Sequence, residues 1–186
     1  MALTAEQASQ VLQRAQCLYD RAQVEAALAR MADEVKRELA GTDPLLLVVM
    51  TGGFVTASEL ALRLDFPLQI DYLHATRYGD LTAGTELRWV AEPRSDLAGR
   101  TVLVVDDILD EGQTLDAILD FCRRQGARAV YSAVLVDKRH DRRQGLQRAD
   151  FTALTVPDRY VFGYGMDYKG YWRNCPAIYA AHKDDE

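Results

Sequence analysis

The sequence predicts an α/β fold with a mostly parallel central sheet flanked by helices. The predominantly apolar runs LLLVVM (residues 45–50), TVLVVDD (101–107) and AVYSAVLVD (129–137) are typical of strands buried on both faces. Segments with helical periodicity separate these runs, and strands that alternate with helices pair in parallel through right-handed crossovers. In such sheets ligands bind at the carboxyl ends of the strands, so we expect the functional residues in the loops that follow the apolar runs.

The first forty residues are predicted to be helical. Thr4 and Gln7 have the spacing of a capping box, and Asp20 can cap a second helix. Gly41 ends that helix. One apolar stripe at helical spacing predicts its buried face: Val24, Leu28, Met31, Val35 and Leu39.

The remaining elements follow in order along the chain. After the first apolar run, residues 54–64 favour a helix and residues 68–78 a strand. A loop-like stretch contains a short strand around residues 87–91. After the second apolar run, residues 114–125 favour a helix, and the aromatic tail from residue 151 is strand-like with turns.

Composition narrows the class of protein. The formal charge of −6 argues against non-specific nucleic-acid binding, although residues 137–143, DKRHDRR, form a local basic segment. The three cysteines are far apart and odd in number, which favours a reducing compartment over disulfides or a metal site. There is no signal-peptide pattern, and the longest apolar run, residues 44–50, is too short for a bilayer. We therefore expect a cytoplasmic protein with no membrane partner.

The stretch VLVVDDILDEGQTL, residues 102–115, carries the strongest chemical signal. The N–H groups at the start of the following helix have no helical partners, and Gly112 and Thr114 suit a phosphate cradle. Asp106 and Asp107 cannot bind phosphate but suit hydroxyls, a cation or a proton. A cradle beside paired carboxylates predicts a phosphorylated sugar as ligand. The alternative, a solvated strand end with a simple helix cap, does not explain the whole stretch.

Two rival motifs do not fit. Apolar residues followed by two aspartates also describe a Walker B strand, but that motif requires an upstream G-x-x-x-x-G-K-[ST] loop. The upstream pair Gly52 and Gly53 is followed by Phe54, without the Lys-Ser or Lys-Thr. The spacing of the acids also differs from that of an EF-hand.

The same stretch resembles the phosphoribosyl-diphosphate motif of type I phosphoribosyltransferases. Residues 135–139 (LVDKR), 156–168 (VPDRYVFGYGMDY) and 171–174 (YWRN) resemble the purine-binding half of the hypoxanthine-guanine phosphoribosyltransferases. The likeness spans roughly residues 45–179. It implies the type I phosphoribosyltransferase fold with a small hood.

The resemblance implies one domain over residues 1–186. Its core would cover about residues 41–156. The hood would come from about residues 1–40 and 157–186.

The resemblance implies roles for the acids and for the loop behind them. Asp106 and Asp107 match the pair that holds the ribose hydroxyls and metal, and Asp110 matches the general base or acid at purine N7. Glu111 stands where the family usually has Thr or Ser, so we expect its side chain to point away from the phosphate. The 5′-phosphate loop would comprise Glu111, Gly112, Gln113 and Thr114.

For the pyrophosphate, the resemblance implies a loop of Thr51, Gly52 and Gly53, helped by Arg173. Many relatives have Lys where this chain has Thr51, so the grip would depend more on backbone N–H groups, Mg²⁺ and Arg173. We also expect the family's non-proline cis peptide bond between Met50 and Thr51.

For the purine, Lys138 matches the donor to the 6-oxygen, Tyr160 the stacking aromatic and Val161 the residue whose backbone reads the base. Asp167 matches a second metal ligand. The plainer alternatives are a solvated lysine, a core tyrosine and a salt bridge between Asp167 and Arg173.

Two further groups complete the predictions. Arg77 and Tyr78 match the start of a mobile lid, although such a loop is also ordinary at a surface. His74, His140 and His182 show no ligand spacing, and we interpret them as structural or exposed.

The resemblance implies purine salvage. The 5-phosphoribosyl group would move from 5-phospho-α-D-ribose 1-diphosphate to N9 of hypoxanthine or guanine, giving IMP or GMP and pyrophosphate, with Mg²⁺ as cofactor. Two alternatives stay open: an enzyme that prefers xanthine, and a non-catalytic regulator of the same fold that binds nucleic acid. The resemblance also implies a homodimer or homotetramer.

Overall fold

The computed structural model describes residues 3–78 and 86–186, apart from the side chains of residues 77, 78, 86 and 87. A six-stranded sheet has the order β4-β3-β2-β5-β6-β7, and a smaller sheet has the order β1-β9-β8. The large sheet contains β2 (Leu45–Val49), β3 (Gln69–Tyr78), β4 (Glu86–Ala91), β5 (Thr101–Leu109), β6 (Ala129–Arg139) and β7 (Phe151–Pro157). All its pairings are parallel except β3 with β4, which confirms the predicted fold class.

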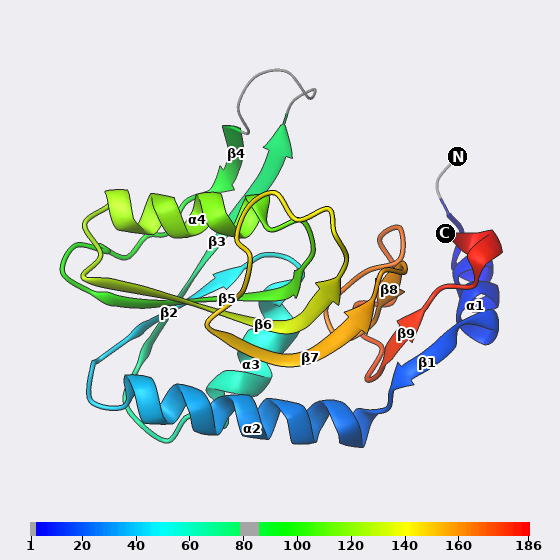
Figure 1. Cartoon of the computed structure of the whole chain (residues 1–186), viewed down its shortest axis with the longest axis horizontal. Helices are drawn as coiled ribbons and strands as arrows, with labels where there is room; N and C mark the ends of the chain where they lie inside the picture. The colour runs from blue at the N-terminus through cyan, green and yellow to red at the C-terminus, as the bar shows by residue number, and fades with distance from the viewer. Residues whose placement is uncertain (1–2, 79–85) are drawn as a thin grey trace.

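Helices cover both faces of the large sheet, as Figure 1 shows. Helices α2 (Arg21–Leu39) and α3 (Gly53–Ala61) lie on one face and α4 (Gln113–Arg124) on the other, whereas α1 (Ala5–Arg14) lies beyond one end of the sheet. Alternate residues of a strand point to opposite faces. In β2, Leu46 and Val48 accordingly share a core cluster with residues of α2 and α3, whereas Leu45 and Leu47 share one with α4.

The predicted N-terminal signals are confirmed. Thr4 and Asp20 both form capping boxes, and Gly41 has a φ of 84° just after α2. Burial of a large apolar side chain contributes about 1.5–3 kcal/mol, so the stripe of α2 supplies much of its stability. Every predicted residue of that stripe is buried: Val24, Leu28, Met31, Val35 and Leu39.

The smaller sheet differs from the expectation for the N-terminus. Residues 16–19 form the strand β1 (Gln16–Tyr19), which pairs antiparallel with β9 (Ile178–Ala180), and β9 pairs with β8 (Val161–Phe162). The prediction that the first forty residues are entirely helical was therefore wrong. The strand is short and half-exposed, and its partner lies about 160 residues along the chain, so no local pattern reveals it.

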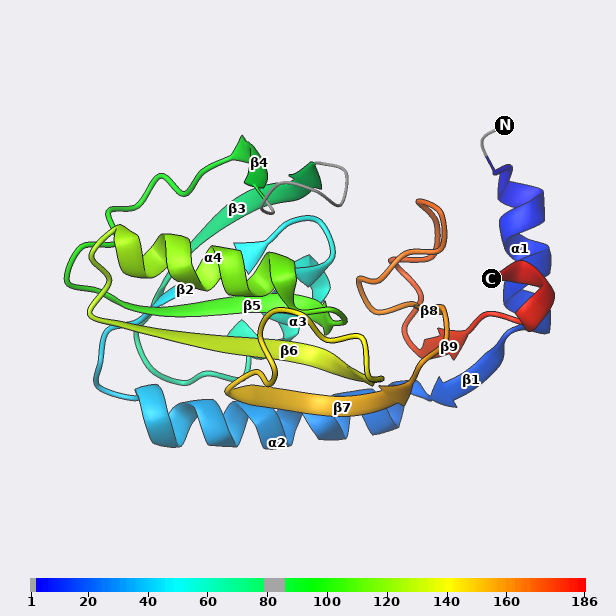
Figure 2. The same ribbon diagram turned by 45° about the horizontal axis from the view of Figure 1, so that its top comes forward.

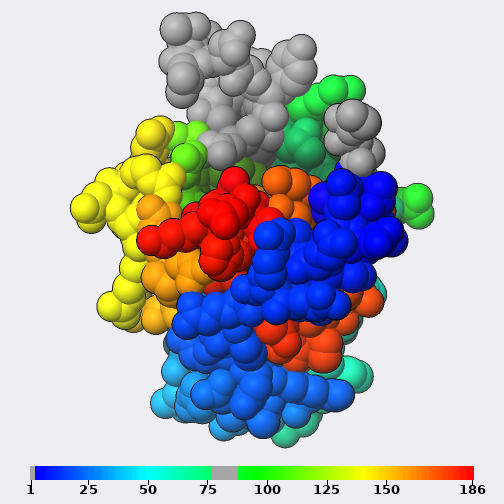
Figure 3. All heavy atoms as spheres, turned by 90° about the vertical axis from the view of Figure 1, so that its right-hand side faces the viewer, coloured from blue at the N-terminus to red at the C-terminus, as the bar shows by residue number. Residues whose placement is uncertain are grey.

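The two chain ends meet at this smaller part. Figures 2 and 3 show α1, β1 and the C-terminal segment side by side beyond one end of the large sheet. Tyr168 and Trp172 support this contact, because Trp172 Nε1 donates to the carbonyl oxygen of Ala8 at 2.7 Å and Tyr168 Oη donates to that of Asp185 at 2.6 Å. The chain closes with a 3-10 helix, η1 (Lys183–Asp185).

Helix α2 belongs to the large-sheet layer, where it packs on α3 and β7. The sequence predicts a hood that includes all of residues 1–40; of these, α1 and β1 accompany the small sheet, whereas α2 packs on the large one. A division of the chain into core and hood stays a prediction. No helix within the described residues is both long and apolar enough to cross a bilayer.

Three element boundaries also differ. Strand β5 continues to Leu109, which pairs with Asp137 of β6, and β6 continues to Arg139, which pairs with Pro157 of β7. Asp106 and Asp107 thus lie within β5, whereas Asp110 and Glu111 follow its last residue. Helix α3 ends at Ala61, three residues before the predicted end.

Candidate active site

The carboxyl ends of β2 and β5 meet at one cavity. The two strands are parallel neighbours, so the loops that follow them lie together. The cavity has a volume of about 310 Å³. Among the residues that line it are most of those predicted for the sugar, the phosphates, the metal and proton transfer: Gly52, Asp106, Asp107, Asp110, Glu111, Gly112, Gln113, Thr114, Asp167 and Arg173.

The loop after β2 lies directly on β5. The bond between Met50 and Thr51 is cis, as expected. A Cβ on Gly52 would lie 1.8 Å from Asp107 Oδ2, and a Cβ on Gly53 would lie 2.6 Å from the carbonyl oxygen of Val105. Only glycine therefore permits this approach. Thr51 is exposed and, with Gly53, is not part of the cavity lining.

Asp106 and Asp107 place two carboxyl groups at the end of β5. The N–H of Asp107 donates to Asp106 Oδ1 at 2.9 Å. Burial, and then the neighbouring charge of Asp107, raise the pKa of Asp106 well above its usual value. Burial likewise raises the pKa of Asp107, against the opposing effect of a hydrogen bond with Asp106 and the charge of Arg173. Two such groups suit hydroxyls or a cation.

The loop after β5 turns into α4 at Gly112. This residue has a φ of 83°, in the left-handed region that favours glycine. Helix α4 starts at Gln113, which lines the cavity, so the N–H groups of its first turn lie at the cavity. These donors and the hydroxyl of Thr114 form the kind of cradle that binds a phosphate.

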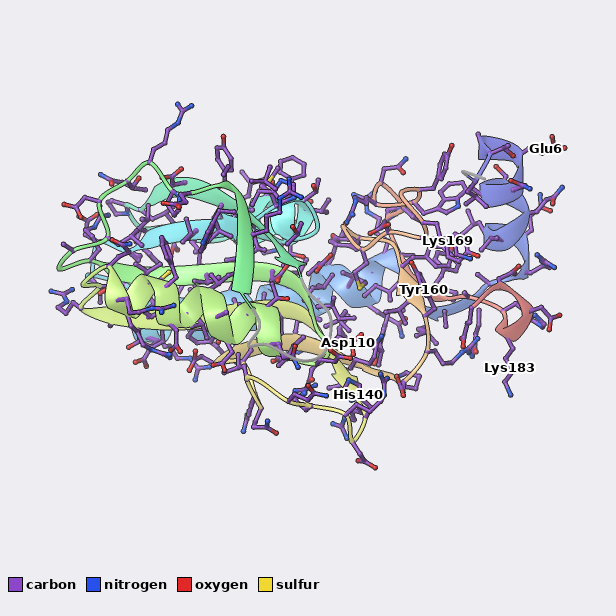
Figure 4. The ribbon with its side chains drawn as sticks, turned by 90° about the horizontal axis from the view of Figure 1, so that it is seen from above. Glu6, Asp110, His140, Tyr160, Lys169 and Lys183 are labelled. Carbon is purple, nitrogen blue, oxygen red and sulfur yellow. The ribbon has the colours of Figure 1, made fainter. Side chains whose placement is uncertain are left out.

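Asp110 accepts hydrogen bonds from two side chains at the end of β6: Lys138 is its penultimate residue and His140 directly follows the strand. Lys138 Nζ lies 2.6 Å from Oδ2, and His140 Nε2 lies 2.7 Å from Oδ1. Burial opposes ionisation of Asp110, but the hydrogen bonds and charges of Lys138 and His140 outweigh it and lower the pKa of Asp110. Figure 4 shows Asp110 and His140 close together, with Tyr160 across from them.

A second cavity of about 190 Å³ adjoins the first. Lys138, Tyr160 and Val161, the residues predicted for the purine, line it together. Both cavities share Asp107, Ile108, Asp110 and Asp167. Tyr160 is held edge-on to Tyr168, with ring centroids 5.3 Å apart, and Val161 begins β8 of the small sheet. One wall of this cavity therefore comes from each sheet.

Asp167 and Arg173 form the salt bridge that was the plainer alternative for them. Arg173 Nη2 lies 2.6 Å from Asp167 Oδ1, and Arg173 Nη1 donates to the carbonyl oxygen of Gly165 at 2.7 Å. A Cβ on Gly165 would lie 2.2 Å from the carbonyl oxygen of Gly52. The segment that carries both residues therefore rests on the loop after β2.

The sequence analysis missed one residue of this site. His140, interpreted from the sequence as structural or exposed, has a side chain that is 2% exposed and contacts Asp110. No spacing along the chain indicated this contact, because it depends on the pairing of β5 with β6. The lid prediction is not tested, because the side chains of Arg77 and Tyr78 and residues 79–85 lie outside the described residues.

The comparisons with known proteins agree with this geometry. A family model described as phosphoribosyl transferase domain matches residues 15–169. A hypoxanthine-guanine phosphoribosyltransferase of Streptococcus pneumoniae is 32% identical over 157 residues, covering 84% of this chain and 87% of the relative. Its counterpart from Bacillus subtilis is 29% identical over the same shares.

A solved structure of a hypoxanthine phosphoribosyltransferase is also similar to this chain. The crystal structure of a hypoxanthine phosphoribosyltransferase from Staphylococcus aureus is similar with a TM-score of 0.85 and 25% identity. The match covers 91% of this chain and 92% of that one. The resemblance in sequence motifs therefore extends to the three-dimensional arrangement of the chain.

Proposed function

Because this chain belongs to the phosphoribosyl transferase family, we propose that it is an enzyme of purine salvage. It transfers the 5-phosphoribosyl group from 5-phospho-α-D-ribose 1-diphosphate to N9 of hypoxanthine or guanine, giving IMP or GMP and pyrophosphate. The observation that carries the proposal is the joining of the two cavities at Asp107, Ile108, Asp110 and Asp167. A sugar phosphate and a base can thus be bound in contact.

Each end of the sugar phosphate has a matching set of groups. Asp106 and Asp107 hold the ribose hydroxyls, and the backbone from Glu111 to Thr114 binds the 5′-phosphate. Backbone groups of Thr51, Gly52 and Gly53 bind the pyrophosphate. Arg173 joins them after it leaves Asp167, and bidentate recognition of phosphate is a strength of arginine.

The base cavity selects a 6-oxopurine. Lys138 donates to the 6-oxygen, and an ammonium group, which only donates, pairs poorly with the amino group of adenine. Tyr160 stacks on the ring and the backbone of Val161 reads its edge. Asp110 takes the N7 proton, which makes N9 the nucleophile at the ribose C1′ as pyrophosphate departs.

Mg²⁺ is part of this proposal. Within the described residues no group of three or more His, Cys, Asp or Glu forms a protein-only metal site, but Mg²⁺ commonly needs only one or two carboxylates and the phosphates of a substrate. Asp106 and Asp107 fit that requirement, because they are adjacent oxygen donors whose mutual repulsion a cation would relieve. Asp167 is the candidate for a second ion. Bound Mg²⁺ supplies charge neutralisation for the diphosphate leaving group.

Asp110 provides the test of the proposal. Asn in its place can accept from only one of Lys138 and His140 and cannot take a proton, so Asp110→Asn is expected to lower kcat by about 10²–10⁴-fold. A spectrophotometric assay with hypoxanthine, guanine and xanthine measures this loss and ranks the three bases. The matched control is Asp120→Asn, on the exposed face of α4. Near wild-type turnover of Asp110→Asn, or no turnover of the wild type, contradicts the proposal.

The same assay separates the alternatives. A clear preference for xanthine would identify the second enzyme, and nucleic-acid binding without turnover would identify the regulator. The charge of −6 and the base cavity favour an enzyme. A homodimer or homotetramer in the cytoplasm completes the proposal. The free state of Cys17, Cys122 and Cys175 supports the location.

A further inference from the structure

His140 is enclosed beside the base cavity although it lies in a charged segment of the chain. Its side chain is 2% exposed, and its Nε2 lies 2.7 Å from Asp110 Oδ1. The proposed function gives this imidazole no task. Burial of a polar ring needs hydrogen-bond partners on both nitrogens, and the structure supplies both.

The backbone fixes which nitrogen carries the proton. The N–H of Arg142 donates to Nδ1 of His140 at 3.0 Å. A ring nitrogen that accepts carries no proton, so in the neutral ring Nε2 carries it. The imidazole therefore donates from Nε2 to Asp110 and offers this carboxylate no lone pair.

The two carboxylate oxygens of Asp110 accept hydrogen bonds from different side chains. Lys138 holds Oδ2 at 2.6 Å and His140 holds Oδ1. In the proposed function, on which this inference rests, Lys138 turns to the 6-oxygen of the purine. We propose that His140 is a positioning residue: it keeps Oδ1 fixed, so that Oδ2 faces purine N7 once Lys138 has turned away.

The segment that carries His140 is braced against the loop of Asp110. The N–H groups of Gln144 and Gly145 donate to the carbonyl oxygen of Glu111 at 3.0 and 3.1 Å, and the side chains of Gln113 and Gln144 are hydrogen-bonded. Arg143 Nη2 contacts Asp137 at 2.6 Å and the carbonyl oxygens of Lys138 and Leu109 at 2.8 and 3.4 Å. A donor on a support of this kind can hold a carboxylate in one orientation.

The proton step balances with His140 unchanged. The N7–H bond breaks and an O–H bond forms on Oδ2, while the electron pair stays in the purine ring. N9 then bonds to C1′, and the bond from C1′ to the diphosphate breaks with its electron pair leaving on pyrophosphate. His140 keeps its Nε2 proton throughout and only donates to Asp110.

Removal of this donor has a defined effect on pH dependence. The ionisable groups that share the base cavity with Asp110 are Lys138, Tyr160, Asp107 and Asp167, and the adjoining cavity is also lined by Asp106, Glu111 and Arg173. Of these, Lys138 lowers the pKa of Asp110, as His140 does. Without the His140 donor that pKa rises, so activity that needs the ionised carboxylate is lost at a higher pH on the acidic side.

Two substitutions of His140 test this inference. His140→Leu is expected to lower kcat/KM for hypoxanthine about tenfold, the loss of one hydrogen bond to a charged group, and to move the acidic limb to higher pH. His140→Gln keeps an N–H donor at similar reach and is expected to restore most of both. The KM for phosphoribosyl diphosphate stays within about twofold in both variants, since the hydrogen bond that is lost lies on the base side. His182→Leu, at an exposed histidine, is the control.

An acidic limb that does not move in His140→Leu would overturn the inference, as would a His140→Gln variant impaired as strongly as His140→Leu. A measurement without turnover covers the case in which His140→Leu does not fold. In ¹⁵N-imidazole NMR of the wild type, with the His140 signals identified by their loss in His140→Gln, we expect the Nε2–H tautomer. The Nδ1–H tautomer would overturn the inference. Absence of turnover in the wild type would instead count against the proposed function alone.

Discussion

A side chain at a left-handed glycine can destabilise the fold in two ways, by backbone strain and by steric clash, and Gly112 allows the two to be measured apart. Gly112 and Gly41 have nearly the same φ, 83° and 84°. Around Gly41 no heavy atom of the described residues comes within 4 Å of the added Cβ. At Gly112 the Cβ would lie 2.4 Å from the carbonyl oxygen and 2.8 Å from the amide nitrogen of Leu146. Gly41→Ala is thus the matched control for Gly112→Ala.

The expected magnitudes follow from these contacts. The left-handed conformation costs an alanine about 1–2 kcal/mol, which both variants bear. Gly112→Ala adds a clash with backbone atoms, worth about 1–3 kcal/mol more. Each kcal/mol lowers Tm by about 2–4 °C in a chain of this size. Gly41→Ala should therefore lose about 2–8 °C and Gly112→Ala clearly more.

Activity provides the second readout. The clash pushes the phosphate loop away from the segment that contains Leu146, whose N–H donates to the carbonyl oxygen of Gly112 at 3.2 Å. We expect the KM for phosphoribosyl diphosphate to rise about tenfold or more in Gly112→Ala, as for the loss of one hydrogen bond to a charged ligand, and not to change in Gly41→Ala. Thermal unfolding and steady-state kinetics measure both effects. Equal Tm losses with an unchanged KM would refute the reasoning.

Two further predictions concern charge. Burial and the charge of Asp107 raise the pKa of Asp106 in the folded chain, so folding favours its protonated form and stability is lost as pH rises through that pKa. Asp106→Asn should therefore raise Tm more at pH 8 than at pH 4 while turnover falls; the same Tm difference at both pH values would contradict this. Lys138→Gln keeps a donor for a 6-oxygen but adds an acceptor for a 6-amino group. Competition assays should show a lower preference for hypoxanthine over adenine, and an unchanged ratio would count against Lys138 as the 6-oxygen donor.

Local patterns in the sequence predicted the parts of the fold that depend on local interactions. The capping residues Thr4 and Asp20 and the apolar stripe of α2 are such parts, since capping and periodicity act within a few residues. The strand β1 depends on a partner about 160 residues away. Its four residues carry no alternation strong enough to predict a strand without that partner.

The site likewise contains a part that local sequence patterns predict and a part that depends on distant residues. The motif from Asp106 to Thr114 is contiguous, and its residues line one cavity as expected. His140 was missed because its partner Asp110 lies 30 residues earlier, just after the neighbouring strand β5. The pairing of β5 with β6 brings the two together, and no spacing along the chain encodes that contact.

Ion pairs within the site determine what a ligand must replace. Lys138 is paired with Asp110, and Arg173 with Asp167. A partly buried ion pair that loses one partner leaves the other uncompensated, so a purine that takes Lys138 must also satisfy Asp110. The N7–H of a 6-oxopurine can do so while its 6-oxygen takes Lys138. Recognition of the base is thus an exchange of hydrogen-bonding partners. Such an exchange contributes more to selectivity between bases than to binding affinity.

Asp106 and Asp107 are different, because among the described residues neither forms a salt bridge like that of Lys138 with Asp110. The charge of Arg173 acts on Asp107, and the pKa of both carboxyl groups stays raised. Ligation of a cation or of two hydroxyls would relieve a repulsion here instead of replacing a salt bridge. Binding at this pair therefore relieves repulsion at the place where the proposed reaction needs the ribose held. This explains why a buried strand ends in adjacent acids whose repulsion costs stability.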